Sequence, residues 1–306
     1  MRVAIIGRTE ILYDTIQLLL KNGHTITCIL TNKEAPEYTK TAADYEALAT
    51  TLSVPFASTA QIANVKAMLA ASGSDIGVSF NYAGVIPKII TDMFPLGILN
   101  AHGGDLPRYR GNACQAWAIL NGEDKVGLCI HRMIGGELDS GDIIAKDYFP
   151  IDASTKVTKV WEWLSMQIPK LFMKAIDKLS FDPDYIIETQ SKNPLDAHRC
   201  YPRKPEDGRV YWHHSALHIL RLINASNKPY AGAFCDYEGF PFIIWDAEIV
   251  SEYENFSAVP GQITRIGDEF VEVACGDGKL RILTAEHLGM VESPNYWIKS
   301  IRRRFT

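Results

Sequence analysis

The amino-acid sequence predicts an α/β protein: a Rossmann-like, mostly parallel sheet wrapped by helices, followed by a small antiparallel, β-barrel-like (OB-like) unit. Three observations carry this prediction. Apolar strands and amphipathic helices alternate along the first half of the chain, which is typical of a parallel sheet with crossover helices. A polar stretch with three prolines interrupts the pattern at 189–208. Short alternating segments with Gly-Asp and Asp-Gly turns follow it, as in hairpins.

The composition is that of a globular protein. A chain of 306 residues, 47% hydrophobic and 22% charged, is long enough for two domains with real cores. The net charge of −5 disfavours a nucleic-acid partner, because phosphate backbones attract basic surfaces. The six cysteines are scattered without a C-x-x-C pair. This spacing favours reduced core thiols over disulfides or a zinc site, and we expect no metal.

The chain begins with "MRVAIIG", a short apolar run that enters a glycine. This pattern indicates a first strand and not a signal peptide. No apolar stretch approaches the ~18 residues needed to cross a bilayer. We therefore expect a cytoplasmic protein without membrane contact.

The elements of the first half follow in order, each with its own signal. Thr9 is a candidate cap for the first helix, Asn22-Gly23 supplies its stop, and Pro87 suits a first helical turn. Strands are expected at 2–6, 25–30, 75–80, 97–102 and 125–133, and helices at 9–24, 42–52, 59–72 and 87–94. A single glycine, Gly7, follows the first strand where a dinucleotide fold would show G-x-G-x-x-G, which excludes a nicotinamide fingerprint.

The second half contains a long helix at 157–180 and a shorter one at 215–226, which Ser215 would cap. The domain bounds that we expect are 1–195 for the sheet domain, 196–210 for a linker and 211–306 for the β-rich domain.

The stretch "LNAHGGDLPRYRG" (99–111) sets an amide and an imidazole two residues apart. On a strand, residues i and i+2 face the same side, so Asn100 and His102 would project together from its carboxyl end. Ligands bind at that edge in open α/β sheets. An amide that donates to an oxyanion, beside an imidazole that moves a proton, suits acyl chemistry. Spacing alone slightly favours the plainer alternative, in which both side chains only cap a turn.

Four segments in order change that balance: "FNYAGVIPKII", "LNAHGGDLPRYRG", "GLCIHRM" and "ELDSGDII". Together they resemble the folate-dependent formyltransferase family, which contains the methionyl-tRNA formyltransferases, the glycinamide ribonucleotide transformylases and the sugar-amine N-formyltransferases. Its pattern is N-x-H-x-S-L-L-P-x-(Y/W)-R-G, followed ~30 residues later by L-D-x-G. The resemblance covers the first half, and "YPRKPEDGRVYW" with the β unit resembles the C-terminal half of the longer members.

The resemblance implies that Asn100, His102 and Asp139 are the catalytic trio and that N10-formyltetrahydrofolate is the formyl donor. A neutral amine would attack the formyl carbon while Asn100 and protonated His102 hold the oxyanion. Asp139 would orient the imidazole or a water and help to take up the amine proton. Only Asp139 fits the L-D-x-G position, and the neighbouring Glu137 and Asp142 are expected to be loop charges or caps.

The resemblance also implies a folate pocket between two loops. Its expected lining residues are Tyr82, Val85, Ile86, Pro87, Met133, Gly135, Gly136 and Leu138. One departure lies beside the trio, because Gly104 replaces the family's serine and Asp105 replaces an apolar residue. A looser backbone and an extra carboxylate at the pocket mouth are expected there. His131 is expected to be an interior histidine and not a catalyst.

The resemblance implies an amine acceptor, and we expect a small molecule: an amino sugar that is nucleotide-linked, as in lipopolysaccharide or surface glycan biosynthesis. The candidate residues for binding it are Arg8, Arg108, Tyr109 and Arg110, because arginine suits phosphate recognition. Methionyl-tRNA, a hydroxyornithine-type amine and hydrolysis of the folate stay open as alternatives. So do a binding module with a degenerate catalytic half and a homodimer.

Overall fold

The computed structural model describes residues 1–252 and 254–306. Contacts between residues divide the chain into two compact units: 1–114, 127–149 and 162–201 form the first, and 115–126, 150–161 and 202–306 form the second. The chain therefore crosses between the units several times. The domain bounds expected at 195 and 210 stay a prediction beside this division.

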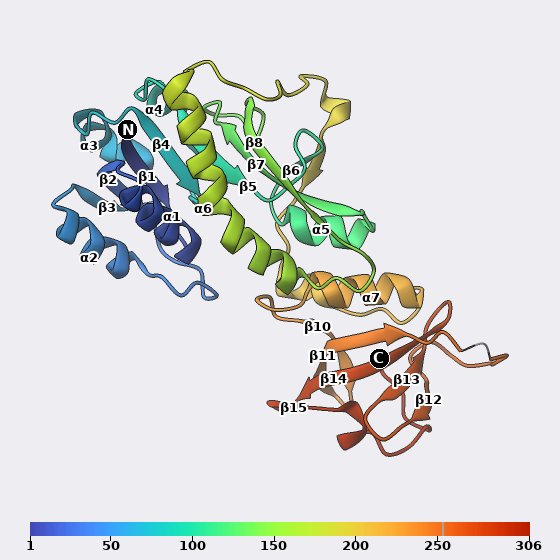
Figure 1. Ribbon diagram of the computed structural model, residues 1–306. Coiled ribbons are helices and arrows are strands. Elements are labelled where there is room, and N and C mark those ends of the chain that lie inside the picture. Colours follow the sequence, from blue (N-terminus) through green and yellow to red (C-terminus); the bar gives the residue numbers. More distant parts are fainter. Residues whose placement is uncertain (253) are drawn as a thin grey trace. The chain divides into compact units, whose positions relative to one another are not determined.

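The first unit is built on a seven-stranded sheet in the order β3-β2-β1-β4-β5-β7-β8 (Figure 1). Neighbours from β3 to β5 run parallel, and β7 pairs antiparallel with β5. The strands are β1 (Arg2–Gly7), β2 (Thr25–Thr31), β3 (Phe56–Ser58), β4 (Ile76–Phe80), β5 (Ile98–His102), β7 (Lys125–Arg132) and β8 (Ile143–Pro150). The predicted mostly parallel sheet is confirmed.

The helices of the first half begin where local chemistry favours it. The Thr9 hydroxyl accepts a hydrogen bond from the backbone N–H of Leu12 and caps α1. Thr41 and Asp44 form a capping box at α2. The helices are α1 (Glu10–Lys21), α2 (Ala42–Leu52), α3 (Lys66–Ala71), α4 (Lys88–Thr91), α5 (Cys114–Asn121) and α6 (Val157–Phe181), with a 3-10 turn at Ile62–Val65. Helix α6 crosses the front of the sheet in Figure 1.

Two of the expected helices are shorter than the sequence predicts. The stretch 59–72 splits into the 3-10 turn and the six-residue α3, and α4 has only four residues. Strands β3, β6 (Tyr109–Gly111) and β8 and helix α5 were not predicted. Part of the expected linker forms β9 (His198–Cys200), which pairs parallel with β6.

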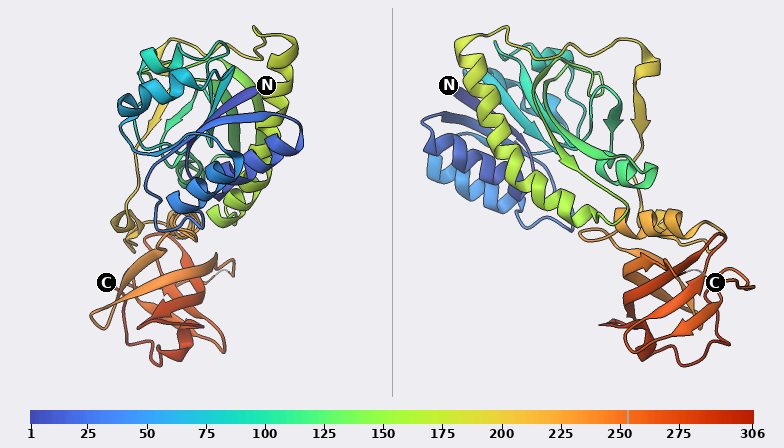
Figure 2. Two further views of the ribbon diagram at one scale, coloured as in Figure 1. Left: turned by 90° about the vertical axis from the view of Figure 1, so that its left-hand side faces the viewer. Right: turned by 45° about the vertical axis from the view of Figure 1, so that its right-hand side comes forward.

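The second unit is an antiparallel sheet in the order β10-β11-β14-β13-β12, with β15 beside β14. The right-hand view of Figure 2 separates these orange and red strands. They are β10 (Ala233–Tyr237), β11 (Phe240–Ile249), β12 (Ile263–Ile266), β13 (Val271–Ala274), β14 (Lys279–His287) and β15 (Met290–Glu292). Helix α7 (Ala216–Ala225) is capped by Ser215, as predicted, and packs its apolar face into this unit's core. The predicted C-terminal antiparallel unit is confirmed.

Within the described part of the chain, none of the helices combines the length and the apolar character that a membrane crossing requires. All six cysteines are free and buried.

Candidate functional site

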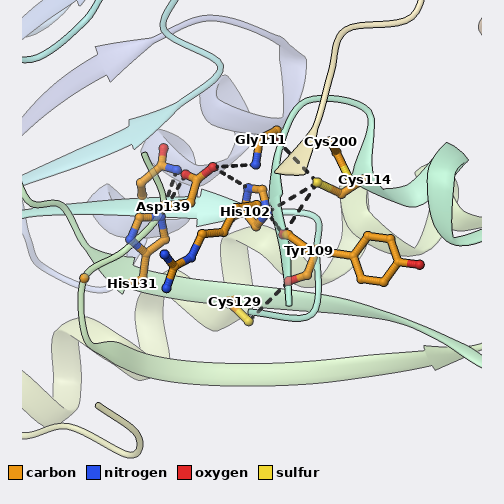
Figure 3. A network of polar contacts seen from close by, with 12 residues as sticks. His102, Tyr109, Gly111, Cys114, Cys129, His131, Asp139 and Cys200 are labelled. Atoms are coloured by element: carbon orange, nitrogen blue, oxygen red, sulfur yellow. Dashed lines mark hydrogen bonds and ion pairs between the residues drawn. The ribbon is translucent and has the colours of Figure 1, made fainter. Parts of the chain in front are cut away.

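Asn100 and His102 project from the carboxyl end of β5, as the strand spacing predicts. Asn100 lies opposite Ser79 of β4 on one side and opposite His131 of β7 on the other. His102 is buried at 7% exposure, and Figure 3 shows its ring between Asp139 and the backbone of Tyr109. The two side chains therefore share one face of the sheet edge at which open α/β sheets bind ligands.

Asp139 reaches the same place from the loop between β7 and β8. Its carboxylate Oδ2 lies 3.5 Å from His102 Nδ1 and accepts a 3.0 Å hydrogen bond from the backbone N–H of Gly111. Its Oδ1 lies 3.4 Å from His131 Nε2. The side chain is only 12% exposed. Asp139, the third member of the predicted trio, thus faces Asn100 and His102 and not bulk solvent.

The backbone of this loop explains the glycine of L-D-x-G. Asp139 has a left-handed φ of 46°, which is uncommon outside glycine. A Cβ on Gly141 would lie 1.8 Å from the carbonyl oxygen of Arg132. Only glycine fits at that position, because the loop must pass this close to β7 for Asp139 to turn inward.

The charges around Asp139 keep it ionised. Burial alone would raise its pKa, but the charge of His102, the hydrogen bond and charge of His131 and the N–H of Gly111 outweigh burial. They hold the pKa of Asp139 well below its usual range. The site therefore presents a buried carboxylate to its two histidines.

The ring of His102 faces an oxygen acceptor at each nitrogen. Nδ1 faces Asp139, and Nε2 lies 2.7 Å from the carbonyl oxygen of Tyr109. The thiol of Cys114 lies 3.6 Å from the same Nε2. Only a protonated ring donates to both acceptors at once. For Nε2 to reach a substrate oxygen, the hydrogen bond to Tyr109 must open.

His131 is a site residue whose contacts sequence reasoning missed. It is an interior histidine, as expected, at 1% exposure. Its Nε2, however, lies 3.2 Å from Asn100 Nδ2 and contacts Asp139, while Nδ1 lies 3.3 Å from the carbonyl oxygen of Arg132. It links the amide to the acid. The antiparallel pairing of β5 with β7 places it opposite Asn100, and neither strand's own sequence predicts that pairing.

Gly104 packs closely against His102 of the trio, and the looser backbone expected there stays a prediction. A Cβ there would lie 2.5 Å from both His102 Nε2 and the carbonyl oxygen of Tyr109. The missing side chain thus allows the two groups to meet. Asp105 is an anchored carboxylate: it pairs with Lys146 at 3.0 Å and accepts a 3.1 Å hydrogen bond from the hydroxyl of Tyr148.

The two loops expected to hold folate lie against each other. The N–H of Gly136 donates to the carbonyl of Ile86 at 3.1 Å, and a Cβ on Gly135 would collide with Lys88 and Pro87. Val85 and Leu138 are exposed, whereas Ile86 belongs to a core cluster on which Tyr82 and Met133 pack. The structure joins the predicted loops, and their role stays a prediction.

The four candidate acceptor residues differ in their surroundings. Arg8 donates to the backbone carbonyls of Asn81 and Lys33, and Arg110 Nη2 donates to the side chain of Gln190 and the carbonyl of Ser191. The ring of Tyr109 is buried beside the guanidinium of Arg108. Their contact with an acceptor stays a prediction.

Comparison with known proteins adds the following matches. The family described as formyl transferase matches residues 1–176, and its C-terminal domain matches residues 203–298. WlaRD, a sugar 3N-formyl transferase solved in the presence of dTDP and 5-N-formyl-THF, is 18% identical with a TM-score of 0.68, over 95% of this chain and 98% of that one.

Two further solved structures have the same fold. An N-formyltransferase from Helicobacter canadensis, in complex with folinic acid and dTDP-3-aminofucose, is 16% identical with a TM-score of 0.67, over 93% of this chain and 99% of that one. HypX from Aquifex aeolicus, in complex with tetrahydrofolic acid, is 17% identical with a TM-score of 0.61. That match covers 98% of this chain, which spans about half of HypX (47%).

Proposed function

This chain belongs to the formyl transferase family, and from that premise we propose that it moves a formyl group from N10-formyltetrahydrofolate to the primary amine of a nucleotide-linked amino sugar. The observation that supports the chemistry best is the meeting of Asn100, His102 and Asp139 at the carboxyl end of β5, with Asp139 3.5 Å from the ring of His102. The sugar acceptor is supported by the two sugar-type neighbours of matching length and by the net charge of −5, which disfavours tRNA.

The proposed reaction is an acyl transfer in two stages. The neutral amine attacks the formyl carbon, and a tetrahedral oxyanion forms. The bond from that carbon to N10 of the folate then breaks, the amine nitrogen loses a proton and N10 gains one. The products are the formamide and tetrahydrofolate.

Each member of the trio has a role in this reaction. Asn100 Nδ2 lies 3.2 Å from His131 Nε2 and carries two hydrogens, so it can direct one of them at the oxyanion. His102 supplies positive charge beside the oxyanion once its bond to Tyr109 opens. Asp139 orients that ring and takes up the amine proton, directly or through a water.

The folate and the acceptor are proposed to contact different residues around the trio. Loops 81–87 and 133–138 would hold the pterin, largely through backbone groups, with the exposed Val85 and Leu138 against its face. Arg8 and Arg108 would hold the acceptor's phosphates, since a guanidinium matches phosphate oxygens in pairs. The protein would then serve surface glycan biosynthesis.

The test is incubation with N10-formyltetrahydrofolate and a panel of amines, with release of tetrahydrofolate followed by absorbance. The panel contains dTDP-linked amino sugars, methionyl-tRNA and a hydroxyornithine-type amine. We expect release with the amino sugars. Release with another amine would replace the acceptor, and release with water alone would indicate a deformylase. No release with any of them would favour a binding module.

Asn100→Ala tests whether the amide of Asn100 takes part in the reaction. Removing one oxyanion donor costs about 10²–10³ in kcat, so the variant should fall by that factor with its fold intact. Asn64→Ala, which removes an exposed amide bonded only to Gln61 among the described contacts, should keep the wild-type rate. Equal rates for both variants would remove Asn100 from the mechanism.

A further inference from the structure

The turn that carries Asp139 is held by a residue from a distant part of the chain. Gln190 is buried at 4% exposure. Its Nε2 donates to the carbonyl oxygen of Asp139 at 2.9 Å and to that of Gly141 at 2.6 Å. One amide group thus bonds to both ends of the turn.

Arg110 sets the direction of that amide. Its Nη2 donates to Gln190 Oε1 at 2.9 Å and to the carbonyl of Ser191 at 3.3 Å. A reversed amide would place its hydrogens against the guanidinium and its oxygen against two carbonyls. Since neither contact could then form a hydrogen bond, the donors of Gln190 are fixed toward Asp139.

The segment around Gln190 is itself tied to the strand that follows the turn. The N–H of Ile143 in β8 donates to the carbonyl of Glu188 at 2.9 Å, and the N–H of Ile187 donates to the carbonyl of Ile143 at 2.9 Å. Gln190 lies outside the two stretches that match the family, 1–176 and 203–298. The hydrogen bonds that hold the turn therefore come from the segment between them.

Asp139 needs such a tie because of its backbone. A left-handed backbone is uncommon outside glycine, and the surroundings of Asp139 must support it. The same backbone directs the carboxylate to His102, His131 and the N–H of Gly111.

We propose that Gln190 is a positioning residue for Asp139: its amide enforces the inward turn at Asp139–Gly141, and Arg110 enforces the amide. The effect on catalysis rests on the proposed formyl transfer, whereas the effect on the Asp139 carboxylate does not.

The main variant is Gln190→Met, which keeps the length of the side chain and removes its hydrogen bonds. We expect kcat to fall about 10²-fold, the loss expected for a catalytic group misplaced by about 1 Å, with the KM of the acceptor unchanged. The acid limb of the pH–rate profile should move to higher pH, because a carboxylate that leaves its histidines regains a higher pKa.

Gln190→Glu is the second variant. It keeps the hydrogen-bond acceptor for Arg110 but loses both donors, so it should show the same changes in kcat and in the acid limb. It replaces Gln190→Met in the test if that variant does not fold.

Gln115→Met is the matched control. Gln115 is also a buried glutamine, but its amide donates to the hydroxyl of Tyr230 and not to the site. It should lower stability without moving kcat or the pH profile. If Gln190→Met loses stability as this control does and keeps both kcat and the acid limb, Gln190 is merely structural and the proposal is overturned.

A titration separates this proposal from the proposed function. The carboxyl carbon of Asp139 is followed by ¹³C NMR against pH and assigned with Asp139→Asn; its pKa should rise in Gln190→Met. If the wild type transfers no formyl group, the proposed function fails, and this titration alone decides the positioning role.

A double-mutant cycle that combines Gln190→Met with Arg110→Met completes the test. Non-additive effects on kcat would support the proposal that Arg110 acts through Gln190. Additive effects with a raised acceptor KM would assign Arg110 to substrate binding and overturn that part of the proposal.

Discussion

At the scale of single residues, the site depends on side chains that satisfy one another's hydrogen bonds. Asp139 contacts two histidines, and His131 holds the amide of Asn100. Residue types and short spacing could predict Asn100, His102 and Asp139, because local motifs carry them. They could not predict that His131 joins them, because an alternating strand does not reveal which neighbour it will pair with.

Gly104 carries the sharpest prediction at this scale. Replacing it with alanine or serine puts a Cβ 2.5 Å from both His102 Nε2 and the carbonyl of Tyr109, so their hydrogen bond cannot keep its present length. The free energy of unfolding should fall by about 1–3 kcal/mol, as for other overpacked sites, measured by urea denaturation.

The two substitutions at Gly104 check each other. Because the collision involves Cβ and not the hydroxyl, Gly104→Ala and Gly104→Ser should be equally destabilised. A serine variant as stable as the wild type would show that the loop has room for the family's residue.

At the scale of elements, the sequence predicted most of what local chemistry determines. The caps at Thr9 and Ser215 and the helices that they start agree with the structure. Strand β3, three residues long, and the split of 59–72 into two short helices were missed. Such short elements carry little periodicity of their own. The eight-residue strand β8 and helix α5 were missed as well, so length alone does not account for every miss.

The loop between β7 and β8 should lose its position if Gly141 gains a side chain. Gly141→Ala places a Cβ 1.8 Å from the carbonyl of Arg132, so the loop must leave β7 and take Asp139 with it. We expect kcat to fall about 10²-fold or more. Steady-state kinetics at saturating donor and acceptor measure this loss.

Gly23→Ala is the control outside the site. Gly23 has a φ of +80°, but a Cβ there meets nothing within 4 Å. Its replacement should cost about 1 kcal/mol of backbone strain and little activity. If Gly141→Ala keeps full activity as this control does, the close approach of the β7–β8 loop to β7 does not position Asp139.

At the scale of the whole molecule, segments far apart in sequence meet around one acid. Asp139 has contacts with residues of β5, of β7, of the end of β6 and of the segment that contains Gln190. The sequence predicted the sheet and the acid, but Gln190 carried no signal of its role. A lone glutamine in a polar stretch is typical of a linker, and only long-range folding makes it interior.

Asp139 should consequently contribute to the pH dependence of the free energy of unfolding. The pKa of Asp139 in the folded protein lies below its ordinary value of 3.8, so between the two values the unfolded chain binds more protons than the folded one. The stability that Asp139 contributes is then fully present above pH 3.8 and is lost as pH falls toward the pKa of the folded state.

Chemical denaturation from pH 6 to pH 2 measures this contribution. The difference in free energy of unfolding between the wild type and Asp139→Asn should shrink below about pH 4. Glu137→Gln, which changes an exposed acid of the same loop, should run parallel to the wild type. If Asp139→Asn runs parallel as well, the carboxylate is not held by its histidines, because a group whose pKa is the same in both states leaves no trace in the pH dependence of folding.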